Sequence, residues 1–76
     1  MQAATFALRT AELTALIGQR AVFSPAALGL SSAFRPGATG SIKRVEHSFV
    51  YVDQTIGGKT KESVLFIADI AEVRAV

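Results

Sequence analysis

Residues 34–76 decide the fold of this chain, and they read FRPGATG (34–40), SIKRVEHS (41–48), FVYVDQTI (49–56), GGKTKES (57–63) and VLFIADIAEVRAV (64–76). Three apolar segments are separated by a polar break at residues 46–48 and by the Gly57-Gly58 pair. Short apolar segments bounded by turn residues are typical of β-strands. The stretch therefore predicts a meander of short strands, as in small β-barrels that serve as binding modules.

The details of the meander suggest how its strands are covered. Ile42 and Val45 bracket two basic residues, which breaks strict alternation and predicts a bulge or a strong bend. Residues 49–53 carry apolar groups on both faces, and residues 64–67 are continuously apolar, as in a buried strand. We expect residues 57–61 to form a polar, mobile connection. Residues 71–75 alternate cleanly and predict a poorly protected edge strand.

The N-terminal part predicts a short helix followed by a strand. Residues 5–9 favour a short strand or an extended arm, and Thr10 to Gly18 favours a helix with Thr10 as N-cap and Gly18 as C-cap. Residues 19–24 have strand character, which Pro25 ends. Residues 25–32 fit either one helical turn or a loop.

Length and composition favour a single domain that assembles with copies of itself. The chain has 76 residues, half of them hydrophobic, and a net charge of +2. A domain of this size buries only about 60% of the surface that its unfolded chain exposes, so further copies of the chain are the simplest cover for the apolar surface that remains.

The apolar runs are far shorter than the roughly 20 residues that span a bilayer, so no membrane partner is expected. The start of the chain lacks the pattern of a signal peptide, and the expected location is cytoplasmic.

Residue types exclude most catalytic chemistry. There is no cysteine and only one histidine, so neither a thiolate site nor a histidine-rich metal site is expected. Gly57-Gly58-Lys59-Thr60 lacks the spacing of a phosphate-binding loop. We therefore predict no enzymatic activity, no cofactor, no metal and no small-molecule substrate.

The positive evidence for function lies around the turn at Glu46–Val50. Residues 35–61 carry five cations against two carboxylates, a balance of +3, which is a weak footprint for nucleic acid. Aromatic side chains stack on bases and cations contact phosphates. The predicted nucleic-acid-binding residues are therefore Lys43, Arg44, Glu46, His47, Phe49, Tyr51 and Lys59. The alternative is that Phe49 belongs to the core and that the charges are simply solvated.

The chain resembles the Sm/LSm family over most of its length. Residues 13–23 are similar to the family's opening helix, glycine and first strand; Gly40, Ile42, Glu46, Phe49 and Val52 fall at pattern positions of its middle strands. Residues 64–73 are similar to its last two strands. The resemblance implies a short N-terminal helix, a strongly bent five-stranded antiparallel barrel, a homo-oligomeric ring, and binding of RNA. Subunit contacts through the last strands would involve Leu65, Phe66, Ile67, Ile70 and Val73.

The pattern departs from the family at several positions. Val50 stands where the family has an RNA-contacting Asn, residues 67–69 stand where it has an Arg-Gly pair, and residues 24–39 form a longer connection. SH3-like barrels fit residues 34–53 nearly as well. We expect an Sm-like or SH3-like barrel whose oligomer binds single-stranded RNA or DNA, with a structural or adaptor protein that makes only protein contacts as the alternative.

Overall fold

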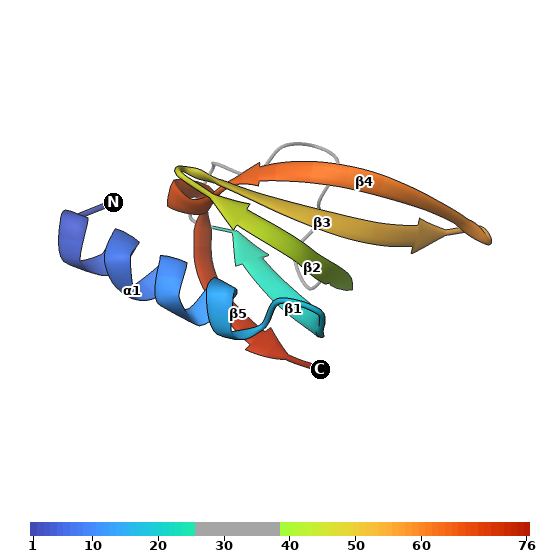
Figure 1. Cartoon of the computed structure of the whole chain (residues 1–76), viewed down its shortest axis with the longest axis horizontal. Helices are drawn as coiled ribbons and strands as arrows, with labels where there is room; N and C mark the ends of the chain where they lie inside the picture. The colour runs from blue at the N-terminus through green and yellow to red at the C-terminus, as the bar shows by residue number, and fades with distance from the viewer. Residues whose placement is uncertain (26–38) are drawn as a thin grey trace.

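A computed structural model describes residues 1–25 and 39–76 of the chain (Figure 1). The expectations for residues 26–38, including the Pro36-Gly37 turn and nearly all of the uncertain segment 25–32, lie outside the described residues. The elements follow in the order α1 (Ala3–Ala15), β1 (Arg20–Pro25), β2 (Thr39–Glu46), β3 (Phe49–Ile56), β4 (Lys59–Phe66), the short 3-10 helix η1 (Ile67–Asp69) and β5 (Ile70–Ala75).

The five strands form one sheet in the order β4-β3-β2-β1-β5, and every pairing is antiparallel. This confirms the prediction of five antiparallel strands behind an N-terminal helix. The sheet is not closed into a barrel, however, because β4 and β5 do not pair with each other in the described residues. After β4, η1 turns the chain across to β1, so β5 extends the opposite edge of the sheet (Figure 1).

The helix begins earlier than the sequence predicted. It spans Ala3–Ala15, so the expected strand or arm at residues 5–9 and the expected N-cap role of Thr10 are wrong. Alanine is the best helix former, and its frequency in this segment extends the helix toward the N-terminus. The Thr10 hydroxyl instead donates to the Phe6 carbonyl one turn back, at 2.9 Å. Gly18 has a φ of 86° beyond the helix, and its N–H donates to the Ile42 carbonyl at 2.8 Å.

The core lies between one face of the sheet and α1. Phe6 of the helix and Leu16, directly after its end, pack against the core from partly buried positions. Arg9 fixes the helix further, because its Nε donates to the Ile70 carbonyl at 3.2 Å. The buried apolar side chains are Leu13, Ala21, Phe23, Ile42, Val50, Val52, Leu65, Ile67, Ile70 and Val73.

Two tight turns make β2, β3 and β4 a continuous meander. His47 adopts a left-handed φ of 50° between β2 and β3. Gly57 and Gly58, with φ of 59° and 79°, form the turn between β3 and β4, a conformation that glycine adopts without steric cost. The mobile connection expected at residues 57–61 is therefore wrong, since β4 already begins at Lys59.

The bulge predicted between Ile42 and Val45 is confirmed. The pairing of β2 with β3 shifts between Ile42 and Arg44, so that one extra residue is inserted in β2. As a result Lys43 and Arg44 are both exposed, while Ile42 stays buried. The bulge therefore places two adjacent cations on the solvent side of the sheet.

Two leucines of α1 give a matched test of this packing. Leu13 is fully buried and Leu8 is 60% exposed. We predict that Leu13→Ala lowers the free energy of unfolding by about 2–5 kcal/mol, because it leaves a cavity in the core. Leu8→Ala should change that free energy by less than about 0.5 kcal/mol. Urea denaturation followed by circular dichroism measures both, and equal losses would show that α1 does not pack as described.

Candidate nucleic-acid interface

The outer face of the sheet carries an exposed apolar cluster over β3 and β4. Alternation turns Val50, Val52 and Leu65 into the core, so their neighbours in the two strands point to solvent. Phe66 is 56% exposed and Val64 is 47% exposed. We call the four outward residues Phe49, Tyr51, Val64 and Phe66 the aromatic face.

Cross-strand pairing holds the aromatic face together. Phe49 lies opposite Phe66, and Tyr51 lies opposite Val64. The rings of Phe49 and Phe66 are 5.1 Å apart between centroids and tilted by 41°. This separation is within the favourable range for aromatic pairs. One side of the pair stays accessible because Phe66 belongs to the outermost strand of the sheet.

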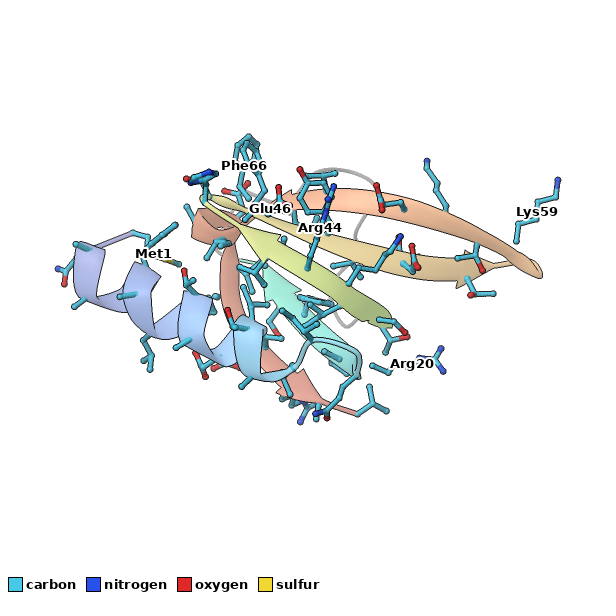
Figure 2. The ribbon with its side chains drawn as sticks, viewed as in Figure 1. Met1, Arg20, Arg44, Glu46, Lys59 and Phe66 are labelled. Carbon is cyan, nitrogen blue, oxygen red and sulfur yellow. The ribbon has the colours of Figure 1, made fainter. Side chains whose placement is uncertain are left out.

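Arg44 covers one end of the aromatic face. Its guanidinium carbon lies 4.0 Å from the centre of the Tyr51 ring, which is a cation–π contact. Its Nη1 also lies 3.2 Å from Oε1 of Glu46. Figure 2 shows that Arg44, Glu46 and Phe66 lie at the same end of the sheet, near the turn between β2 and β3.

Lys43 ties three strands together beside the aromatic face. Its Nζ lies 3.1 Å from Oε2 of Glu62 on β4 and 3.8 Å from Oδ1 of Asp53 on β3. The hydrogen bond to Glu62, followed by the negative charge of Asp53, raises the pKa of Lys43 above its ordinary value. Lys43 therefore stays positively charged through the neutral pH range.

The structure brings together most of the predicted binding residues but not all of them. Arg44, Glu46, Phe49 and Tyr51 share the outer face, and His47 is exposed in the adjoining turn. Lys59 lies at the tip of the β3–β4 hairpin, at the far end of the long axis (Figure 2). It therefore belongs to a separate basic tip with Lys61 and not to the aromatic face.

Charges around the aromatic face are nearly balanced. Its immediate cations are Lys43 and Arg44, and both contact carboxylates. The neighbouring carboxylates are those of Glu46, Asp53 and Glu62, which gives this part of the surface a net charge of −1. The basic balance of residues 35–61 in the sequence therefore does not produce a basic patch at this face.

The expected interface residues divide into two groups. Leu65, Ile67, Ile70 and Val73 are buried in the chain's own core, whereas Phe66 is exposed. Neither Phe66 nor Val64 was among the predicted nucleic-acid-binding residues, although both belong to the aromatic face. The signal that finds them is the alternation of β4, in which Ser63 and Leu65 point inward.

Val50, at the family's Asn position, is fully buried and cannot reach a ligand from that core position.

Two polar hollows lie against the sheet. One, of about 340 Å³, lies between α1 and the strands β1 and β5, where Arg9, Glu12, Glu72 and Arg74 line it. The other, of about 310 Å³, lies over β1, β2 and β3 and is lined by Arg20, Ser41 and Asp53 among others.

No group of three metal-ligating side chains occurs in the described residues, and no helix there is long and apolar enough to cross a bilayer.

Comparison of the chain with protein-family models, with curated proteins and with solved structures finds no match.

Proposed function

We propose that this chain is a subunit of an Sm-like oligomer that binds single-stranded RNA or DNA on its aromatic face. The observation that supports this most directly is the pairing of exposed Phe66 with half-buried Phe49 beside Tyr51, with Arg44 over the Tyr51 ring. A sheet that presents aromatic rings on neighbouring strands is a known platform on which unpaired bases stack.

Stacking supplies most of the binding free energy in this proposal. Each base stacked on an aromatic side chain contributes about 1–3 kcal/mol, and the contribution depends little on the base. Phe66 offers the accessible ring, since it is more than half exposed on the outermost strand. Phe49 supports that ring from the next strand, at 5.1 Å between centroids.

The ion pairs of the face still allow contacts to phosphates. Exposed ion pairs contribute only about 0–1 kcal/mol, so exchanging a carboxylate for a phosphate costs little. Arg44 has further N–H donors beyond the one near Glu46, and Lys43 is half-exposed. Two cations imply few phosphate contacts and therefore a shallow dependence on salt.

Assembly is the second part of the proposal. In the described residues β4 and β5 each pair on one side only, which leaves two free strand edges. Free edges tend to pair with another chain, and pairing β4 of one copy with β5 of the next would satisfy both. The Sm-like arrangement implied by the sequence has this kind of contact between neighbouring subunits.

The near-balanced charge of the face favours one competing function. A structural or adaptor protein would use the same aromatic face to contact a protein, since binding there would not require phosphate contacts. The two functions differ in their response to oligonucleotides at low salt.

A substitution at Phe66 tests base stacking. We predict that Phe66→Leu weakens binding of a fluorescent oligo(U) strand by about 1–3 kcal/mol, because an apolar side chain remains but the ring is lost. Fluorescence anisotropy at low salt measures the change, with Leu8→Ala as an exposed control on α1. Unchanged affinity in Phe66→Leu would exclude stacking on this residue.

Salt dependence and one charge removal test the phosphate contacts. With two cations, the logarithm of the association constant should fall with log salt at a slope of about −1.4, since each phosphate contributes about −0.7 for single strands.

We predict that Glu46→Gln tightens binding up to about fivefold by removing the carboxylate that competes for Arg44. Glu12→Gln makes the same charge change on α1, and an equal effect there would point to overall charge.

The mass in solution tests assembly. Light scattering at micromolar concentration should give a mass of several chains, because an isolated subunit leaves both edges unpaired. The mass of a single chain would contradict the assembly. A mass of several chains without any oligonucleotide binding at low salt would instead favour the adaptor.

A further inference from the structure

The hollow over β1, β2 and β3 lies on the same side of the sheet as the aromatic face. Asp53 is the next outward residue after Tyr51 on β3, about 7 Å further along the strand. We call this space the Asp53 hollow, and its lining residues are Arg20, Thr39, Gly40, Ser41, Asp53 and Thr55. A nucleic-acid strand with one base stacked on the aromatic face therefore has its next base within reach of this hollow.

A carboxylate, a hydroxyl and a guanidinium form one row across the Asp53 hollow. Asp53 lies directly opposite Ser41, and Ser41 lies directly opposite Arg20. Directly opposite residues of an antiparallel pair share a face, so all three side chains belong to the outer face. Neighbouring strands are about 4.8 Å apart, so the Cα atoms of Asp53 and Arg20 are about 10 Å apart. The row thus has an acceptor at one end and donors at the other, with room for one base between them.

Both ends of the row have hydrogen-bonding capacity to offer a ligand. The Asp53 side chain is 32% exposed, and its Oδ1 lies 3.8 Å from Nζ of Lys43, which is too long for a hydrogen bond. Both carboxylate oxygens can therefore accept hydrogen bonds from a ligand. The exposed Arg20 side chain has no hydrogen bond or ion pair within the described part of the chain. It points away from α1, and its five N–H donors face solvent (Figure 2).

We propose that the Asp53 hollow binds a guanine base of the strand that stacks on the aromatic face. The edge of guanine carries two neighbouring donors, N1–H and N2–H, followed by two neighbouring acceptors, O6 and N7. The Asp53 carboxylate accepts from N1–H and N2–H, and the Arg20 guanidinium donates to O6 and N7. The Ser41 hydroxyl, in the middle of the row, donates to O6. This inference rests on the single-strand binding proposed above and adds a base preference to it.

The other bases match only part of the row. Adenine and cytosine each have one amino group beside a ring nitrogen that accepts, and uracil has one N–H between two carbonyls. With any of these bases, one carboxylate oxygen of Asp53 faces another acceptor and gains no hydrogen bond. Single strands are recognised through hydrogen bonds to such base edges. The row therefore selects guanine by the order of its donors and acceptors.

The charge near the aromatic face fits base contact at this point. A carboxylate repels a phosphate, because both are negatively charged, but it accepts hydrogen bonds from the N–H groups of a base. Asp53 therefore favours a base over the phosphate backbone in the hollow. The near balance of charge on this part of the surface, which limits the number of phosphate contacts, is thus consistent with base recognition.

Oligonucleotides that differ in one base test the preference. Wild-type protein should bind an oligo(U) strand with one central guanine at least about fivefold more tightly than oligo(U) of the same length. A central adenine is the control for stacking, because it is also a purine but lacks both donors, and it should lose that gain. Fluorescence anisotropy at low salt measures all three affinities. The guanine edge is the same in RNA and DNA, so oligo(dT) strands should show the same ratios.

Base analogues assign the two ends of the row. Inosine lacks the N2 amino group and 7-deazaguanine lacks the N7 acceptor, so each should weaken binding to wild-type protein at least about threefold relative to guanine. Asp53→Asn should abolish the effect of inosine and keep that of 7-deazaguanine, and Arg20→Met should do the reverse. Such coupling between one side chain and one base atom indicates a direct contact.

Two variants outside the hollow control for charge. Glu72→Gln and Arg74→Met make the same charge changes on the outer face of β5, and both should keep the response to both analogues. Circular dichroism confirms that each variant is folded.

The remaining outcomes separate the base site from the function on which it rests. Equal affinity for the guanine and uracil strands would overturn the base site and leave stacking on the aromatic face intact. An equal gain from adenine, or a guanine preference that persists in both Asp53→Asn and Arg20→Met, would overturn it in favour of purine stacking alone. Failure of every strand to bind at low salt would overturn the proposed function as well.

Discussion

The register between β3 and β4 is the constraint on which the rest of the structure depends. Eight residue pairs run from Phe49 opposite Phe66 to the pair beside the Gly57-Gly58 turn. This register sends Val50, Val52 and Leu65 into the core and sends the aromatic side chains to solvent. A shift of one residue would exchange the two sets, exposing the core residues and burying the charges. Core and candidate site therefore depend on the same register.

Much of the fold follows from local patterns in the sequence. The turn at Glu46–Ser48, the bulge before Arg44 and the terminal strand are each determined by neighbouring residues, and each appears in the structure. The start of α1 was missed because Phe6 and Leu8 alternate like a strand, whereas the surrounding alanines favour a helix. The polar residues after Gly58 suggested a loop, but pairing with β3 draws them into a strand.

The candidate site was less predictable because it depends on tertiary placement. Lys59 is close in sequence to the aromatic residues, yet the length of the hairpin carries it to the opposite end of the molecule (Figure 2). Phe66 belongs to an apolar run that suggested full burial, and only its position on an edge strand exposes it. The charges of Lys43 and Arg44 were visible in the sequence, but their carboxylate partners come from β3, from β4 and from β2 itself.

The pairing of β1 with β5 has a consequence for the entropy of the folded chain. It joins residues that are far apart in the sequence, such as Phe23 and Val73, whereas the two hairpins join near neighbours. The entropy lost on closing a loop grows with the logarithm of its length, so this contact carries the largest closure cost in the sheet. In the described residues β5 pairs with β1 alone, so a single strand pairing has to offset this closure cost.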